Sequence, residues 1–240
     1  MKTKIKCPPM RLRLIDRIDE IRDEELHKTW PDKSYAHAFW DSLCFSLVEI
    51  DDLPFETYPQ EQIGMTIYNQ QELNAVLRVV EAGNILVKKV GTNQPDDVYI
   101  NSPYVQALID AAKDAYNIMI NNELPMWKEL MLNIGHLSPA KYRESWIDPN
   151  DNHSFSKHIK QHIDFFDKLG IEKDPQKQIG YSVFNEEELN AALQAISALR
   201  DVLKYVGENK ENEAYTSSPY WQKLIKTADA AYDVFMRCEE

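Results

Sequence analysis

The sequence has few of the residues that mark disulfide, metal and cofactor proteins. Its three cysteines, Cys7, Cys44 and Cys238, are far apart and form no C-x-x-C pair. We therefore expect a reducing compartment and neither a disulfide framework nor a zinc site. Only 7 of its residues are glycine, and it contains no G-x-G-x-x-G, G-x-x-x-x-G-K-[ST] or G-x-S-x-G motif. Nucleotide-cofactor and hydrolase classes have no support, and we expect no cofactor.

Long apolar runs are also missing. The longest, such as 118–120 and 163–166, fall far short of the roughly 18 to 20 residues that a membrane span needs. The N-terminal segment begins with basic residues, as a signal peptide does. However, prolines and then Arg11 and Arg13 stand where the apolar part of a signal peptide belongs. We therefore expect a cytoplasmic protein that does not associate with membranes.

Acidic residues outnumber basic ones. The 39 Asp and Glu residues against 27 Lys and Arg residues give a formal net charge of -12, and 43% of the residues are hydrophobic. That apolar content favours a folded core over a disordered acidic tail. Because nucleic-acid binding requires Lys and Arg to neutralise phosphates, the negative charge disfavours nucleic acid and favours a basic protein partner.

The chain repeats itself at an offset of about 116 residues, with roughly a third of the aligned positions identical. Matching segments include Pro9-Met10 with Pro125-Met126, Gln62-Ile63-Gly64 with Gln178-Ile179-Gly180, and Ser102-Pro103-Tyr104 with Ser218-Pro219-Tyr220. We predict a tandem duplication. The first unit covers residues 1–124, with an N-terminal tail at 1–8, and the second covers 125–240.

Hydrophobic residues recur at helical spacing in each unit. In the second, the longest such series is Leu189, Leu193, Ile196, Leu199, Leu203 and Val206. Asn185 and Glu188 form the pattern of an N-cap with a capping-box glutamate, and Gly207 supplies the C-terminal glycine. The matching helix of the first unit runs from Asn69 to Gly91 and contains Gly83, which costs about 1 kcal/mol relative to Ala.

Further helices complete each unit. We predict opening helices at 9–21 and 125–136, short second helices that close at Trp30 and Trp146, and third helices at 35–50 and 154–166. The last helices begin at Ser102-Pro103 and Ser218-Pro219 and bury Leu108, Ala112, Ala115 and Met119, or Leu224, Ala228, Ala231 and Phe235. Only residues 64–68 and 180–184 show a weak alternation of apolar and polar side chains, the pattern of an extended segment. We predict an all-α fold of two tandem homologous helical-bundle units, each of four to five helices, related by a pseudo-twofold.

One polar element, Trp-x-Asp-x4-His-x-Phe, occurs in both units. Its residues are Trp30, Asp32, His37 and Phe39, and then Trp146, Asp148, His153 and Phe155. An Asp beside a His suits general-base catalysis, but a general base also needs a nucleophile or a metal, and none stands at a fixed spacing. We favour a structural interpretation in which each Asp caps a helix and the aromatic residues close the core.

His158 and His162 lie four residues apart on a predicted helix, a spacing that suits a metal ion. Two ligands do not make a metal site, and the matching residues of the first unit are Ser42 and Ser46. We therefore favour an exposed polar face and expect no metal.

Scattered motifs give the chain a family resemblance. They are Pro9-Met10-Arg11, Trp30-x-Asp32, Gln62-Ile63-Gly64, Glu72-Leu73-x-Ala75 and Ser102-Pro103-Tyr104. Each unit resembles a family of small, one-unit bacterial proteins without assigned biochemical activity, some of which look like immunity proteins of polymorphic toxin systems. The second unit departs from the pattern. It has Trp127 where Arg11 stands, and no acidic run matches 19–25.

The resemblance implies an immunity protein, which is not an enzyme and which neutralises a cognate toxin in the cytoplasm by direct protein contact. A basic toxin suits the net charge of -12. We expect the contact at Asp19, Glu20, Asp23 and Glu24, and next at Asp51 and Asp52. Runs of charge are commonly only solvated faces, and carboxylates such as Glu186, Glu187 and Glu188 also suit a helix N-terminus. The chain is expected to be a monomer or a homodimer.

Two other classes stay open. A helical adaptor or chaperone would hold a helix of its partner between the two units and would use an apolar contact surface. An enzyme would depend on the Trp-x-Asp-x4-His element alone. An acidic inhibitor would associate more slowly as salt is added, whereas an apolar adaptor would depend little on salt.

Overall fold

The chain folds into helices grouped in two compact units. The computed structural model describes residues 4–24, 38–138 and 154–239. The first unit is Lys4–Glu123 together with Cys238 and the residue after it, and the second is Leu124–Arg237. Within the described residues, β-type pairing is limited to two isolated bridges, Ile63 with Ile67 and Ile179 with Val183. The prediction of an all-α protein is confirmed.

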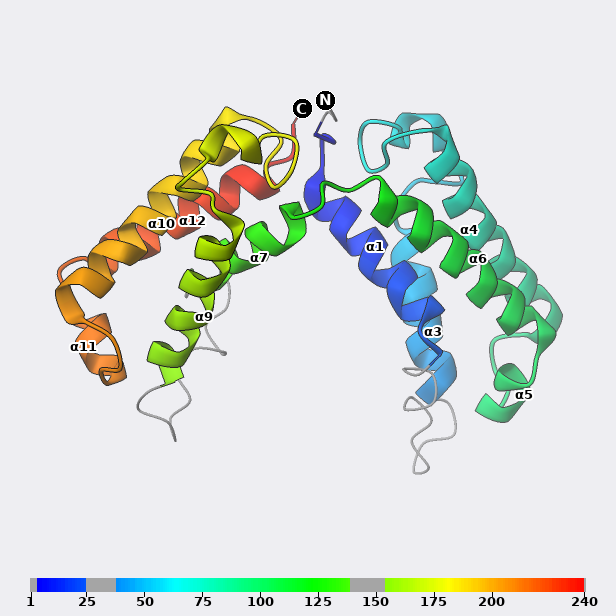
Figure 1. Ribbon diagram of the computed structural model, residues 1–240. Helices are drawn as coiled ribbons and strands as arrows, with labels where there is room; N and C mark the ends of the chain where they lie inside the picture. The colour runs from blue at the N-terminus through cyan, green and yellow to red at the C-terminus, as the bar shows by residue number, and fades with distance from the viewer. Residues whose placement is uncertain (1–3, 25–37, 139–153, 240) are drawn as a thin grey trace. The chain divides into compact units, whose positions relative to one another are not determined.

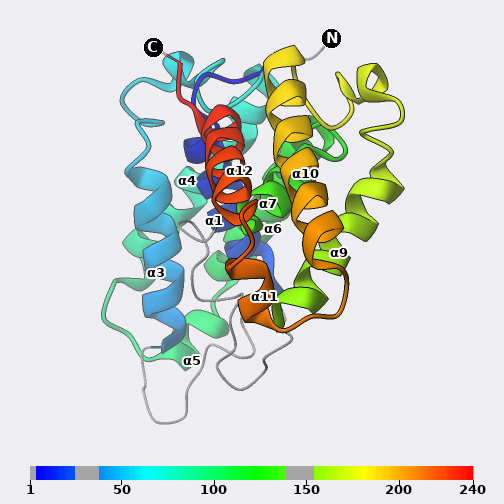
Figure 2. The ribbon, with the colours of Figure 1, turned by 90° about the vertical axis from the view of Figure 1, so that its left-hand side faces the viewer.

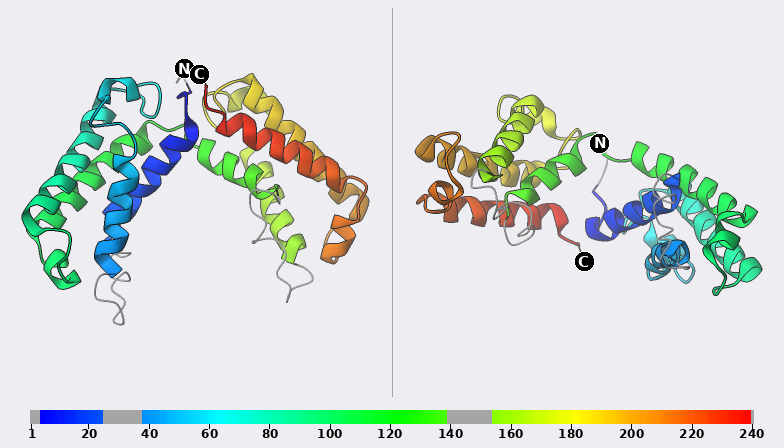
Figure 3. Two further views of the ribbon diagram at one scale, coloured as in Figure 1. Left: turned by 180° about the vertical axis from the view of Figure 1, so that it is seen from behind. Right: turned by 90° about the horizontal axis from the view of Figure 1, so that it is seen from below.

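The first unit is built around two long antiparallel helices. Its elements are α1 (Pro8–Arg22), α3 (Ala38–Asp51), the short 3-10 helix η1 (Pro59–Gln62), α4 (Gln70–Val90), α5 (Asp96–Ile100) and α6 (Pro103–Asn121). Helices α4 and α6 lie side by side, α1 packs on α6, and α3 packs on α1 (Figures 1 and 3). Apolar side chains from all four helices form one buried cluster. The five-residue helix α5 was not predicted.

The second unit has the same succession of elements. They are α7 (Trp127–His136), α9 (Ser154–Leu169), η2 (Pro175–Gln178), α10 (Glu186–Val206), α11 (Asn212–Thr216) and α12 (Trp221–Met236). Helices α10 and α12 lie side by side, and α7 packs on α12 (Figure 2). The long helix begins at residue 70 in the first unit and at 186 in the second, an offset of 116. None of the described helices has the length and apolar composition that a membrane span requires.

Each long helix has the predicted asparagine cap. The Asn69 side chain accepts a hydrogen bond from the backbone N–H of Glu72 at 3.0 Å, and Asn185 accepts from Glu188 at 2.9 Å. The glutamate does not return a bond to its cap as predicted. Glu72 instead accepts from the backbone N–H of Tyr68 at 2.7 Å, and its carboxylate is fully buried. The start of α4 therefore contains both an asparagine cap and a buried glutamate.

Glycine ends both long helices, as predicted. Gly91 has φ 92° and Gly207 has φ 86°, a region that favours glycine. Ser102 caps α6 by accepting from the backbone N–H of Tyr104. The matching prediction for α12 is wrong, because this helix begins at Trp221 and Pro219 lies in the preceding turn.

The predicted apolar stripes form the core. All eight stripe residues of α6 and α12 are buried, namely Leu108, Ala112, Ala115, Met119, Leu224, Ala228, Ala231 and Phe235. In α10 the prediction is confirmed for Leu189, Ile196 and Leu199, whereas Leu193, Leu203 and Val206 are half-buried. The short helices predicted to end at Trp30 and Trp146 lie outside the described residues.

A buried ion pair joins the helices of the first unit. Arg11 of α1 is 2% exposed and Glu72 of α4 is 0% exposed. Two parallel hydrogen bonds of 2.9 and 3.0 Å connect the guanidinium to the carboxylate, a geometry that gives strong pairing. Arg11 also donates to Glu123 and to the backbone oxygens of Thr66 and Met119. One side chain thus connects α1, α4, the end of α6 and the loop before α4.

The second unit uses an aromatic side chain at the corresponding place. Trp127 donates from Nε1 to Glu188 Oε2 at 3.3 Å, and its ring packs against Phe184 and Phe235. Glu188 is 0% exposed, like Glu72. The buried glutamate is therefore common to both units, while its partner differs.

Removing Arg11 should destabilise the protein because it leaves Glu72 as a buried carboxylate without its cation. We predict that Arg11→Met lowers the free energy of unfolding by about 3–5 kcal/mol in denaturant titrations. Arg13→Met, on the same helix, breaks an exposed pair with Glu49 and should have a much smaller effect. Equal losses in the two variants would contradict the assigned role of Arg11.

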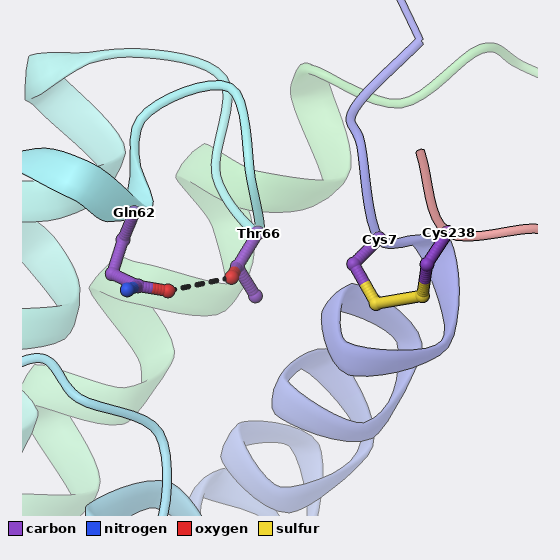
Figure 4. The surroundings of a disulfide bond; sticks show 4 residues. All are labelled: Cys7, Gln62, Thr66 and Cys238. Carbon is purple, nitrogen blue, oxygen red and sulfur yellow. Dashed lines mark hydrogen bonds between the residues drawn. A yellow bond between two sulfur atoms is a disulfide. The ribbon is translucent and has the colours of Figure 1, made fainter. Parts of the chain in front are cut away.

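The two ends of the described chain are covalently joined. Cys7 and Cys238 form a disulfide across a sequence separation of 231, so the prediction that no cysteines pair is wrong (Figure 4). The C-terminal segment reaches the start of α1, where the backbone N–H of Glu239 donates to Lys6 O at 2.6 Å. Nearby, the Thr66 hydroxyl donates to Gln62 Oε1 at 2.8 Å (Figure 4). Disulfides are rare in cytosolic proteins, so this bond weighs against the predicted cytoplasmic location.

Reducing this bond should destabilise the fold, because the cross-link restricts the unfolded chain over a very long loop. We predict that Cys238→Ser lowers the free energy of unfolding by about 2–5 kcal/mol. Dithiothreitol should produce the same loss in the wild-type protein and none in the variant. A wild-type protein whose unfolding is unaffected by reductant would show that the cross-link contributes nothing.

Candidate functional site: a groove between α3 and α4

Most of the carboxylates predicted to contact a partner are already paired at the surface of the first unit. Asp23 is exposed. Four others form ion pairs, namely Asp19 with Arg22, Glu20 with Arg17, Glu24 with Lys113, and Asp52 with Arg13. These neighbouring cations partly balance the charge that each carboxylate would present to a partner.

Asp51 differs from the other predicted carboxylates. It is exposed at the C-terminal end of α3, and no Lys or Arg within the described ranges forms an ion pair with it. It lies at the edge of a cavity of about 150 Å³ between α3 and α4. The apolar part of the lining includes Trp40, Leu47, Val48, Ile50, Val80 and Val87. An exposed carboxylate that pairs with no described Lys or Arg thus lies beside an apolar cavity.

Gly83 allows α3 to approach α4 at this cavity. A Cβ atom at Gly83 would lie 2.8 Å from Cδ2 of Leu47, so Leu47 occupies the space that any larger residue would need. The glycine that weakens the helix interior therefore has a packing role. The helical pattern indicates the cost of this glycine, whereas only the packing of Leu47 shows its role.

A second hollow, of about 370 Å³, continues along α4. It is lined by Glu56, Leu77, Val80, Glu81, Asn84, Ile85 and Lys88, and it shares Val80 and Asn84 with the first. We call the two hollows together the α3/α4 groove. Val48 and Ile85 are 53% and 40% exposed in it. The groove has an apolar floor and a rim where acidic residues outnumber basic ones.

In the second unit, side chains of the unit itself fill most of the place that matches the α3/α4 groove. Arg200 stands where the first unit has Asn84, and it donates to Glu172 at 2.6 Å and to Asp167 at 2.5 Å. Those two carboxylates match Glu56 and Asp51 of the first unit. Leu199, fully buried, replaces Gly83. The remaining cavity, about 70 Å³, includes Lys160 and Asp164 in its lining.

Cys44 is a free cysteine in the groove lining, but its environment does not favour nucleophilic chemistry. Burial, and secondarily the charge of Asp41, raise the pKa of the thiol. A raised pKa keeps the thiol protonated at neutral pH, and the thiolate is the reactive form. Cys44 is therefore not an activated nucleophile.

The histidines of the second unit form a small cluster. His162 of α9 is 6% exposed, its Nδ1 lies 2.8 Å from Asn133 Oδ1, and its ring centroid is 5.7 Å from that of His136. The predicted exposed polar face is thus wrong for His162, while His158 is half-buried. Within the described parts of the chain, no group of three or more His, Cys, Asp or Glu residues is arranged to hold a metal ion.

Burial of His162 should make the stability of the protein depend on pH. Burial, followed by the charges of His136 and His158, lowers the pKa of His162 to about 4. The unfolded chain binds a proton near pH 6.5, whereas the folded chain does so only near pH 4. Stability should therefore be complete above pH 6.5 and fall toward pH 4, by on the order of 3 kcal/mol.

His162→Gln should remove most of this pH dependence, as measured by denaturant unfolding at several pH values. As a control, Arg237→Gln changes an exposed residue of the same unit. Its free energy of unfolding should depend on pH as that of the wild type does. If the free energy of unfolding of His162→Gln depends on pH as in the wild type, the pH dependence arises from other groups.

The Trp-x-Asp-x4-His elements lie largely outside the described residues. The signal for the groove was present in the sequence, because aligning the units places Gly83-Asn84 opposite Leu199-Arg200.

Comparison with known proteins gives a family and no activity. No curated protein and no solved structure matches the chain. A family described as "Domain of unknown function (DUF7945)" matches residues 5–125, which cover the first unit and about half of the chain. The chain, through its first unit, belongs to the DUF7945 family.

Proposed function

We propose that this chain is an immunity protein that neutralises a cognate basic toxin by direct protein contact and without catalysis. The observation that carries the proposal is Asp51, an exposed carboxylate without an ion-pair partner in the described chain, at the edge of an apolar cavity. Energetically important protein contacts commonly combine an apolar anchor in a pocket with a charged group at its edge. The family match supports neither this function nor any other.

Inhibition of this kind needs a complementary surface and no bond-making residues. The net charge of -12 attracts a basic partner and accelerates encounter. Carboxylates of the first unit would occupy positions on the toxin that its anionic substrate otherwise takes. Asp19, Glu20, Asp23 and Glu24 extend the contact in this proposal, while Asp51 and Asp52 adjoin the groove.

We also propose that the two units are copies of one duplicated module. The matching sequence segments and the recurrence of η1, α4 and α5 as η2, α10 and α11 support this. Their pseudo-twofold relation stays a prediction. Because Arg200 closes the matching place in the second unit, we assign the partner contact to the first.

We place the action in the cytoplasm of the producing cell, where an immunity protein meets a toxin directed at its own host. The Cys7–Cys238 bond is the observation that weighs against this location. The two are compatible if both thiols are reduced in the cell and pair after oxidation.

A helical adaptor or chaperone is the second candidate. The apolar floor of the groove favours it, because Val48, Ile85 and Val87 are all partly exposed there. This alternative differs from the first in its physical signature, since apolar association depends little on salt.

Co-expression with the protein encoded by the neighbouring reading frame tests the proposal. We predict that this neighbour alone stops growth and that co-expression of the present chain restores it. Replacing Asp19, Glu20, Asp23 and Glu24 together by Lys should reduce protection, because reversed charges repel a basic toxin. A neighbour without toxicity, or growth that is not restored, would contradict the proposed function.

The rate of association with that neighbour separates the two candidates. An acidic inhibitor should bind at least about tenfold more slowly when the salt concentration rises from 50 to 500 mM. An association rate that does not change with salt would favour the apolar adaptor.

A further inference from the structure

Both units have the same pair of carboxylates, but only in the second unit does an arginine of the described chain pair with them. In the second unit, Arg200 bridges Asp167 near the end of α9 and Glu172 in the turn that follows. In the first unit the matching carboxylates, Asp51 and Glu56, are retained. Their cation is replaced by Asn84, whose amide donates only to Glu56, at 2.6 Å.

This replacement leaves a local charge imbalance. Among the described residues, no Lys or Arg forms an ion pair with Asp51 or Glu56, and both side chains are exposed. A neutral amide supplies one hydrogen bond where a guanidinium supplies several and a positive charge. An external cation at this place would therefore gain the interactions that Arg200 makes internally.

The neighbouring position differs in the same direction. Leu199 fills the core side of α10, whereas Leu47 of α3 lies against Gly83 on α4 and the 150 Å³ cavity opens beside them. The first unit thus lacks the guanidinium of Arg200 and has an apolar cavity next to its place. The missing guanidinium and the cavity together describe the group that the groove would accept.

We infer that the α3/α4 groove binds an arginine of a partner protein between Asp51 and Glu56, with an adjacent apolar side chain of that partner entering the cavity beside Gly83. An arginine fits better than a lysine because its planar fork reaches two carboxylates at once. A protein partner fits because two neighbouring side chains on one backbone supply both the guanidinium and the apolar group. The inference rests on the proposed function only in that the partner is a basic protein.

A defined peptide tests the inference without knowledge of the toxin. The probe is a 16-residue alanine-based helical peptide that carries one leucine and one arginine one turn apart. It is titrated into the ¹⁵N-labelled full chain. We expect backbone amide shifts at Asp51, Glu56 and Asn84, and no comparable shifts around Arg200. The same peptide with citrulline, an uncharged isostere of arginine, should bind at least about tenfold more weakly.

Asn84→Arg should abolish binding of the arginine peptide, because the variant supplies its own guanidinium to both carboxylates. The control variant, Asn74→Arg, adds the same charge at an exposed position of α4 outside the groove and should bind as the wild type does. Both positions are exposed, so both variants should fold.

Three results would overturn the inference. They are an absence of shifts in α3 and α4, equal binding of the citrulline peptide, and wild-type binding by Asn84→Arg. Equal affinity for N-acetyl-arginine amide alone would also overturn it, because the groove would then be a small-molecule site. Growth rescue by the wild-type chain together with failure of the peptide would place the toxin contact elsewhere and leave the proposed function intact.

Discussion

Each unit must satisfy a fully buried carboxylate at the first turn of its long helix. Glu72 and Glu188 are both 0% exposed, and a buried charge is tolerated only where donors surround it. Arg11 meets this requirement in the first unit by joining α1 to α4 and to the end of α6. In the second, Glu188 Oε2 accepts hydrogen bonds from Trp127 Nε1 and from the backbone N–H of Phe184, and the Trp127 ring packs against Phe184. The convergence of helices in each unit depends on this carboxylate and its partner.

The opposite end of the long helix is where the units differ in what they present to solvent. In the second unit Leu199 is buried and Arg200 pairs with two carboxylates at the surface, whereas Gly83 and Asn84 stand at these positions in the first. The cost of a glycine within a helix, about 1 kcal/mol, is offset by the closeness of Leu47. At the surface of the first unit, Asn84 thus takes the place of the cation that pairs with both carboxylates in the second, and the groove has an acidic rim.

Helices with long, regular stripes could be predicted from the sequence. The caps at Asn69 and Asn185 and the stripe of α6 were all visible in local patterns. Helix α5, at five residues, is too short for a periodic signal. The disulfide joins residues separated by 231 positions, and no local pattern indicates such a contact. No single local pattern indicates the groove, because its carboxylates come from the end of α3 and the turn that follows, its glycine and asparagine lie on α4, and only folding brings these segments together.

The account assigns partner binding to one face of the first unit and gives the second unit no direct part in it. Hydrogen–deuterium exchange of the whole chain, measured with and without the toxin that we propose as its partner, tests this most directly. The account predicts slower exchange in α3 and α4 on binding and unchanged exchange in α9 and α10. Slower exchange confined to the second unit, or to α1 alone, would contradict it.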